Sequence, residues 1–224
     1  RQAIHDAFEG LRFIRRIPIL FGAMGLDLFA VLFGGAVALL PAIAEERLGV
    51  GAVGLGWLRA GVGIGAGVVA VTLSVRPLQH RLGRILLFVV ALFGLGTIGL
   101  GLTRSFALAF IAIVLLSAAD AVSMFIRLTL VPLATPEDMR GRVLAVENVF
   151  IGASNELGAA ESGLTAAFMG LVGAVVFGGA ATLVVVALWW RLFPALRDMD
   201  TFDEIRPDPI PVPQSPEQKA NPSP

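Results

Sequence analysis

The stretch ALAFIAIVLLSAADAVSMFIRLTLV, at 107–131, decides the fold class of this chain. It is 25 residues long and contains only two ionisable side chains, Asp120 and Arg127. A helix that rises 1.5 Å per residue needs about 20 predominantly apolar residues to cross the hydrocarbon core of a bilayer. We therefore predict a membrane-spanning helix at this stretch.

Five further apolar stretches of similar length lie on either side of it. The six predicted spans are 19–44, 53–75, 85–102, 107–131, 143–169 and 171–192. The composition agrees, because 56% of the residues are hydrophobic, 15% are charged and the mean hydropathy is +0.83. We predict an all-α integral membrane protein with a bundle of six transmembrane helices.

The charge balance and the missing cysteines exclude several functions. The chain has 17 basic and 17 acidic residues, so it lacks the dense basic surface that nucleic-acid binding requires. It contains no cysteine, which excludes disulfides and thiolate metal sites. No histidine cluster, HExxH-like pattern or Ser-His arrangement occurs in a span. We expect no enzyme activity, no metal and no cofactor.

The distribution of arginines predicts the orientation. Basic residues near span ends stay on the cytoplasmic side of a membrane. They are frequent in the N-terminal segment, in the connectors 76–84 and 132–142 and at the C-terminal end, but the alternate connectors carry only Arg47 and Arg104. Both termini are therefore predicted to be cytoplasmic.

The same pattern divides the chain into three parts. Residues 1–17 form a cytoplasmic linker, 18–193 the membrane bundle, and 194–224 an acidic, proline-rich tail that we predict to be disordered. Because the chain opens with Arg1 and not with Met, we expect it to be a fragment of a longer protein.

Ionisable side chains inside the predicted spans are the strongest functional signal. Each is expensive at the bilayer centre, by about 2.5–3.5 kcal/mol on insertion scales, so such residues pair or face water. Apart from Arg191 at the end of the sixth, the third and sixth spans contain none, which predicts a 3+3 repeat. The seven residues are Asp27, Arg59, Asp120, Arg127, Glu147, Glu156 and Glu161.

Depth in the membrane suggests how these charges pair. Arg127 and Glu147 lie at similar depth on consecutive spans, so we predict that they pair. We predict the same for Arg59 and Glu161. Asp27 and Asp120 lie nearest the middle of the membrane, with no basic partner at their depth, and they are candidates either to carry a proton or to hold the structure.

The fifth span carries a polar stripe along one helical face. At 100° per residue, Glu147, Ser154 and Glu161 share this face, and Asn155 and Ser162 lie at its edge. Such a stripe indicates the lining of a water-filled cavity, although hydrogen bonding between helices explains it as well. Glu156 points the opposite way and is predicted to face another helix.

The glycines predict close helix packing rather than phosphate binding. Gly61, Gly63, Gly65 and Gly67 lie within a predicted span with no preceding strand, so small-xxx-small contacts explain them better than a phosphate loop does. Gly34, Gly35 and Pro41 mark either a position where the first span can bend or a site of close helix packing, which explains them equally well.

Several short motifs resemble a known family. The strings A-T-P-E-D-M-R-G-R-V at 134–143 and F-I-G-A-S-N-E-L-G at 150–158, with A-A-D-A-V-S at 118–123 and F-G-G-A-V-A-L-L-P at 33–41, resemble the C-terminal half of Major Facilitator Superfamily transporters. The resemblance is to the bacterial branch of enterobactin-type siderophore exporters and related drug efflux proteins, and it covers residues 17–196.

Two loops carry the most specific part of this resemblance. The first contains Pro136, Arg140, Gly141 and Arg142, and Thr135 is predicted to cap the following helix. The second, R-P-L-Q-H-R-L-G-R at 76–84, is similar to the superfamily loop motif G-x-x-x-D-R-x-G-R. It matches at Arg81, Gly83 and Arg84 and departs at Arg76 and His80, where glycine and aspartate are usual.

The resemblance implies one half of a twelve-helix secondary transporter in the inner membrane of a bacterium. Its partners would be protons, a small-molecule substrate, the lipid bilayer and the N-terminal six-helix half of the same transporter, and the expected activity is proton-coupled export of a siderophore or drug. Uptake, a dimer of six-helix halves, and a membrane scaffold that does not transport are the alternatives.

Overall fold

The structure is a computed structural model that describes residues 2–205, with side chains from residue 8 onward, and those residues form helices and no strands. The longer helices are α1 (Gln2–Arg16), α2 (Pro18–Phe33), α4 (Gly51–Val75), α5 (Leu82–Leu102), α6 (Phe106–Leu133) and α7 (Glu137–Leu192). The short ones are η1 (Gly35–Val37), α3 (Leu40–Ala42), η2 (Ile43–Arg47), α8 (Pro194–Arg197) and η3 (Asp203–Ile205).

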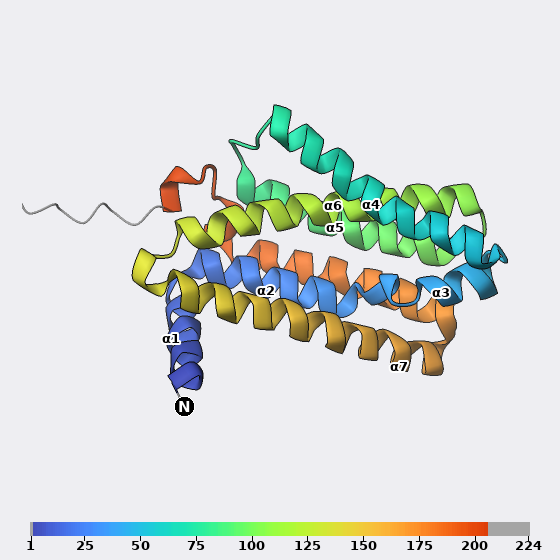
Figure 1. Cartoon of the computed structure of the whole chain (residues 1–224), viewed down its shortest axis with the longest axis horizontal. Helices are drawn as coiled ribbons and strands as arrows, with labels where there is room; N and C mark the ends of the chain where they lie inside the picture. The colour runs from blue at the N-terminus through green and yellow to red at the C-terminus, as the bar shows by residue number, and fades with distance from the viewer. Residues whose placement is uncertain (1, 206–224) are drawn as a thin grey trace, which may run out of the picture.

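The long helices lie side by side along the long axis of the molecule, and α1 crosses one end of the bundle (Figure 1). Five segments are long and apolar enough to cross a membrane: Pro18–Arg47, Gly51–Val75, Leu82–Leu102, Phe106–Leu133 and Glu137–Leu192. The length and the apolar composition of these helices confirm the prediction of a membrane bundle of helices.

The fifth segment, α7, folds back on itself at Gly170. Its 56 residues would measure about 84 Å as one straight helix, which is about twice the thickness of a bilayer. Gly170 has φ 75° and ψ 166°, and the chain reverses there, so 137–169 and 171–192 form two antiparallel arms (Figure 1). These arms correspond to the fifth and sixth predicted spans.

The first predicted span is interrupted where the sequence places Gly34, Gly35 and Pro41. Helix α2 ends at Phe33, and the chain continues through a short 3₁₀ turn, the short helix α3 and a π turn to Arg47. Gly35 lies against the carbonyl oxygen of Gly158 and the hydroxyl of Ser162, and a side chain at this position would collide with both. The break therefore lies where the first span packs closely on α7.

Glycines bring several helix pairs into backbone contact. Gly61 and Gly65 of α4 lie against α6, as expected for small-residue packing, whereas Gly63 and Gly67 of the same helix face open space. Gly94 of α5 packs on the second arm of α7. Helix α4 packs chiefly on α6, and α5 lies between α6 and α7.

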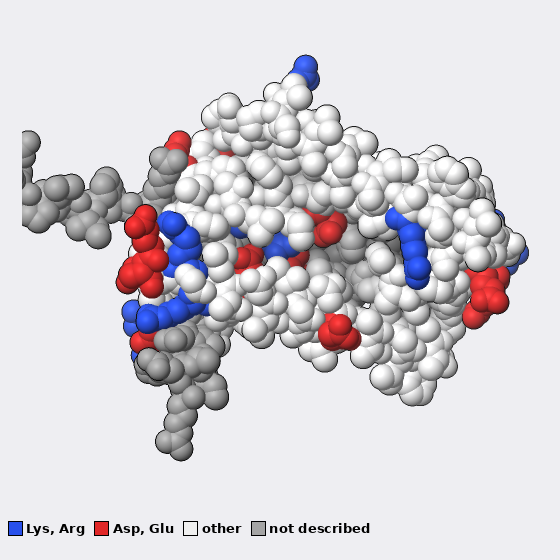
Figure 2. Space-filling view, in the orientation of Figure 1, with Lys and Arg blue, Asp and Glu red and all other residues white. Residues whose placement is uncertain are grey.

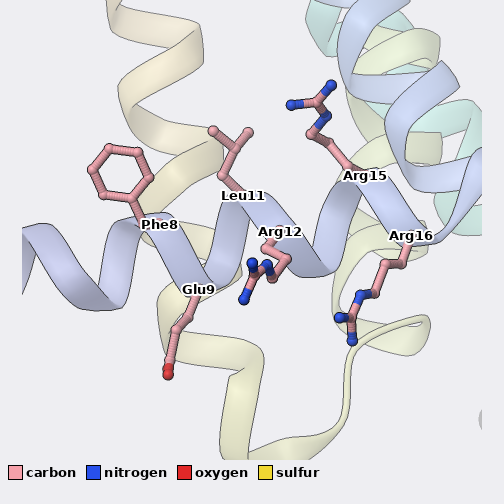
Figure 3. A pocket seen from close by; sticks show the side chains of 6 residues that line it. All are labelled: Phe8, Glu9, Leu11, Arg12, Arg15 and Arg16. Carbon is pink, nitrogen blue, oxygen red and sulfur yellow. The ribbon is translucent and has the colours of Figure 1, made fainter.

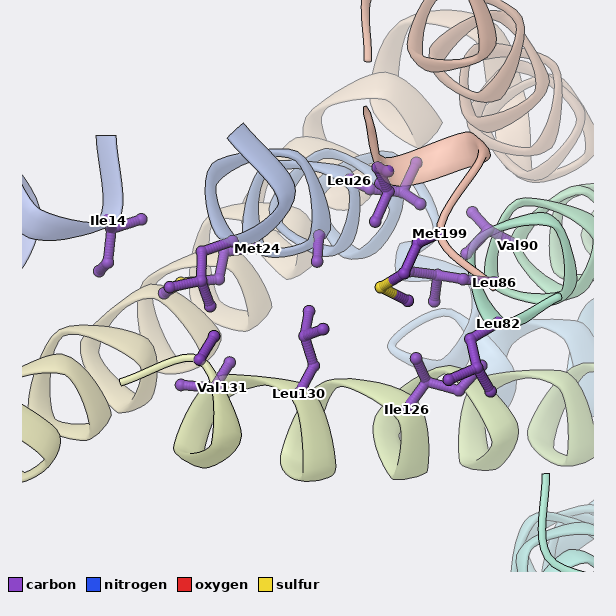
Figure 4. Close-up of a cluster of buried hydrophobic side chains, with 14 of the residues drawn as sticks. Ile14, Met24, Leu26, Leu82, Leu86, Val90, Ile126, Leu130, Val131 and Met199 are labelled. Atoms are coloured by element: carbon purple, nitrogen blue, oxygen red, sulfur yellow. The ribbon is translucent and has the colours of Figure 1, made fainter. Parts of the chain in front are cut away.

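Two clusters of buried apolar side chains stabilise the bundle. The larger lies where α1, α2, α5, α6 and α7 meet the segment after α7, and the view of it labels Ile14, Met24, Leu26, Leu82, Leu86, Val90, Ile126, Leu130, Val131 and Met199 (Figure 4). The smaller cluster, which includes Leu40, Leu58, Leu100, Ile113 and Val175, joins α3, α4, α5 and α6 to the second arm of α7.

The tail that the sequence predicted to be disordered from residue 194 is ordered over its first part. Residues 194–205, called the C-terminal strap below, form α8 and η3. Leu196 and Met199 of the strap are buried in the larger apolar cluster, which explains why the strap is ordered despite its polar composition. Residues 206–224 lie outside the described part of the chain.

Candidate functional site

Three buried side chains from three helices form an ion-pair cluster. Asp27 of α2, Arg127 of α6 and Glu147 of α7 are each at most 6% exposed. Arg127 Nη2 lies 2.7 Å from Asp27 Oδ1, and Arg127 Nη1 lies 3.9 Å from Glu147 Oε1. The predicted proximity of Arg127 and Glu147 is confirmed, but the expectation that Asp27 has no basic partner is wrong.

Asp120 extends this cluster toward the surface. It is exposed and lies seven residues before Arg127 on α6, about 10 Å along the axis. A small cavity is lined by Asp27, Asp120 and Ser123, and a second by Asp27, Arg127 and Glu147. Asp27 therefore lines both cavities. Charged side chains of both signs are visible near the middle of the molecule as well as at its two ends (Figure 2).

The cluster contains more acidic than basic groups. One guanidinium pairs with two carboxylates, those of Asp27 and Glu147, and the carboxyl group of Asp120 lines a cavity with Asp27. Within the described residues, Arg127 Nε and Glu147 Oε1 are buried without a hydrogen-bond partner. Such an atom costs about 1–3 kcal/mol when it is left unsatisfied. The cluster can therefore accept a proton or a cation without first breaking a bond to Glu147 Oε1.

The polar stripe of α7 is divided between a packed part and an exposed edge. Ser154 and Ser162 are buried, and Gly158 between them lies against the backbone of Val31 and Leu32 in α2. Asn155 is exposed, and its Nδ2 donates to the carbonyl of Ile151 at 2.8 Å. The middle of the stripe therefore packs on α2, which favours the packing explanation there over a cavity lining.

The second predicted ion pair does not form in the described part of the chain. Glu161 is half-buried and accepts a hydrogen bond from Thr165 Oγ1 at 2.7 Å, whereas Arg59 is exposed on α4. The sequence predicts matching depth for the two residues, but α4 packs on α6 while the first arm of α7 packs on α2. Glu156 is also exposed rather than packed against a helix.

The loop before α5 holds the C-terminal strap. His80 Nδ1 lies 3.0 Å from Asp200 Oδ2, and the backbone N–H of Arg81 donates to Asp200 Oδ1 at 2.8 Å. The backbone N–H groups of Leu82 and Gly83 donate to the carbonyls of Asp200 and Met199. The strap thus satisfies N–H groups that begin α5, which a helix leaves without an internal partner.

Electrostatics strengthen this contact. The hydrogen bond to His80 and then the bond from the Arg81 N–H hold the pKa of Asp200 below its usual value. The hydrogen bond from Arg197 lowers the pKa of Asp198, whose Oδ1 also lies 3.8 Å from Arg84 Nη2. The sequence motif identified Arg81, Gly83 and Arg84, but nothing in the sequence pattern pointed to their partners in the strap.

The loop before α7 differs in one detail from the prediction. The residue that precedes α7 is Pro136, and Thr135 does not cap the helix because its hydroxyl donates to the Val131 carbonyl at 2.6 Å. Arg142 Nη1 bonds Glu9 Oε2 of α1 at 2.8 Å. Arg140 is half-buried, and Gly141 faces open space.

Comparisons with known proteins give one match. A family model described as transmembrane secretion effector matches residues 1–221. No curated protein and no solved structure matches the chain. Among the described residues, no group of three or more histidine, cysteine, aspartate or glutamate side chains is arranged to hold a metal ion.

Proposed function

The chain belongs to the transmembrane secretion effector family of Major Facilitator-type transporters, and from this premise we propose that it is the C-terminal six-helix half of a proton-coupled exporter. The family match supports a multi-pass membrane transporter. The half-transporter role, the coupling ion and the direction are our proposal, as are the bacterial inner membrane and the cytoplasmic termini.

The packing of the helices supports the proposal of a 3+3 repeat. Helix α4 packs on α6, and the first arm of α7 packs on α2. In a 3+3 repeat the first and fourth spans are equivalent, as are the second and fifth, so these two contacts correspond to each other. Helix α5 and the second arm of α7, whose ionisable residues Arg84 and Arg191 lie only at their ends, pack on each other as equivalent third members would.

The observation that carries proton coupling is the sharing of Arg127 by two buried carboxylates. With Asp120 nearby, the site has two negative charges in excess when all groups are ionised. Excess negative charge among apolar helices is expensive, so uptake of a proton or a cationic substrate group lowers the energy of the site. We propose that Asp120 receives the proton, because it is exposed, and that Asp27 carries it inward.

Transport would then follow from rocking of this bundle against the N-terminal half, with the substrate bound between them. The substrate would be a small molecule such as a siderophore or drug, with Asn155 and Glu161 as candidate contacts. The alternative is a scaffold in which the same ion pairs only specify helix pairing, since the burial of Asp27 and Arg127 is compatible with that role.

Proton flux separates these functions. The natural protein that contains this chain would be reconstituted in proteoliposomes, and flux would be recorded after addition of a catecholate siderophore or a cationic dye. The variants are Asp27→Asn and Asp120→Asn, with Glu156→Gln as the matched control because that carboxylate is exposed and outside the cluster.

We expect substrate-dependent flux in the wild type and in the control, and its loss in at least one aspartate variant that is folded by circular dichroism. Flux that persists in both aspartate variants would contradict the assigned proton carriers. A folded wild type without flux for either probe would favour the scaffold.

A further inference from the structure

Helix α1 is held across the end of the bundle instead of extending into solvent. The chain turns at Ile17, whose backbone is extended, before Pro18 begins α2. Gly10 lies against the backbone of Arg142, and Ile14 is buried in the larger apolar cluster. The helix therefore runs across the direction of the spans at the end where the last turn of α6 meets α7 (Figure 1).

The outer surface of α1 has two different edges. Phe8, Leu11 and Arg15 project from one side of the helix, and Glu9, Arg12 and Arg16 from the other (Figure 3). Phe8 is 67% exposed although it is aromatic. The six side chains line a common surface cavity. Apolar side chains, those of Phe8 and Leu11, beside several arginines are the pattern of a helix that lies in a membrane interface.

Three arginines of α1 are available to bind an anionic ligand. Arg12, Arg15 and Arg16 are exposed, and within the described residues none of them forms an ion pair. The nearby carboxylate, that of Glu9, is bonded by Arg142 at 2.8 Å. Because Arg16 lies two residues before Pro18, where the first apolar span begins, the three guanidiniums lie at headgroup depth.

We propose that α1 lies in the headgroup layer and binds anionic phospholipid through Arg12, Arg15 and Arg16, with Phe8 inserted among the acyl chains. Guanidinium groups bind phosphate oxygens with two parallel hydrogen bonds, and juxtamembrane basic clusters attract anionic lipid. The proposal rests on membrane insertion of the chain, not on proton coupling, so it can fail or succeed independently of the transport mechanism.

Lipid retention tests the proposal. The natural protein in neutral detergent would be titrated with phosphatidylglycerol or phosphatidylcholine, and bound lipid would be counted by native mass spectrometry. The variant is Arg12→Gln/Arg15→Gln. The matched control is Arg76→Gln/Arg104→Gln, which removes two exposed arginines located away from α1.

We expect preferential retention of phosphatidylglycerol, weakened on the order of thirty-fold in the α1 variant and unchanged in the control. Equal weakening in both double variants would overturn the proposal, because it would indicate a general charge effect. Full competition by soluble glycerol phosphate would also overturn it in favour of a free-phosphate site.

The position of Phe8 gives a second test that does not depend on affinity. This chain has no cysteine, so Phe8→Cys and Arg12→Cys each place one nitroxide label on α1. In vesicles that contain phosphatidylglycerol, we expect the label at position 8 to be accessible to oxygen and the label at position 12 to a water-soluble nickel complex. Accessibility of both positions to the nickel complex alone would contradict insertion.

Discussion

Asp200 Oδ2 lies 3.0 Å from His80 Nδ1 although 120 residues separate the two. The loop motif that ends at Arg84 usually carries aspartate at the position of His80, and this chain lacks that acid. The strap therefore brings a carboxylate to the same loop from the other end of the sequence. Its bonds hold the strap against residues 80–83, at the start of α5.

The strap is expected to loosen in acid. The pKa of Asp200 is lower in the folded protein than in the unfolded chain. Such a group stabilises the fold fully above its unfolded pKa, about 3.9, and this contribution is lost as the pH falls through the folded pKa. We predict that hydrogen-exchange protection of the Leu82 and Gly83 amides is constant near neutral pH and decreases below about pH 4.

The variant Asp200→Asn identifies the group responsible. It removes the charge, so protection of these amides should already be lower at neutral pH and should depend less on acid. Asp138→Asn is the matched control, because Asp138 is an exposed carboxylate in the first turn of α7 and lies outside the strap. An unchanged acid response in Asp200→Asn would assign the effect to another group.

Gly83 tests the fit of the strap to α5. A Cβ atom at this position would collide with the backbone carbonyl of Leu196, whereas a Cβ at Gly99 of the same helix would meet open space. We predict that Gly83→Ala destabilises the protein by about 1–3 kcal/mol. Gly99→Ala should stabilise it by up to about 1 kcal/mol, because alanine is the better helix former. Thermal unfolding in detergent measures the stability of both variants. Equal unfolding midpoints for the two would show that the strap shifts to accommodate the new methyl group without loss of stability.

Removing Arg127 leaves two buried carboxylates without a cation. We predict that Arg127→Gln destabilises the bundle by about 3–5 kcal/mol, while Arg59→Gln, at an exposed position on α4, changes stability by less than about 0.5 kcal/mol.

Two double charge reversals test the ion pairs of Arg127. Asp27→Arg/Arg127→Asp should restore expression better than Glu147→Arg/Arg127→Glu, because the paired atoms of Arg127 and Asp27 lie 2.7 Å apart and those of Arg127 and Glu147 lie 3.9 Å apart. Membrane-fraction expression is the readout, and the reverse order would contradict the geometry.

Depth along a span can be predicted from the sequence, but the neighbours of a helix cannot. Counting from the shared connector places Arg127 beside Glu147, because a short connector forces the two helices to be adjacent. The same counting pairs Arg59 with Glu161, which belong to helices that pack on different partners. Depth alone also misses the partner of Asp27, because it ignores the length of the arginine side chain that reaches this carboxylate from α6.

The strap shows a second limit of the sequence. Its composition after Pro194 predicts disorder, since prolines and acidic residues dominate the tail as a whole. Leu196 and Met199 nevertheless provide enough apolar surface to fix residues 194–205, and their burial depends on a surface that α2 and α5 form together. A pattern of two apolar residues is too short to be recognised without that surface.

The turn of α7 depends on one backbone conformation. Gly170 combines φ 75° with ψ 166°, a region that is essentially restricted to glycine. A Cβ atom added at either Gly170 or Gly163 of the same helix would meet nothing within 4 Å, so the two positions differ in backbone conformation and not in available space. Alanine at Gly170 should therefore cost about 1–3 kcal/mol, and alanine at Gly163 should be neutral or stabilising. Thermal unfolding of the two variants in the same detergent checks this, and a Gly170→Ala protein as stable as Gly163→Ala would mean that the two arms can reverse direction through a different turn.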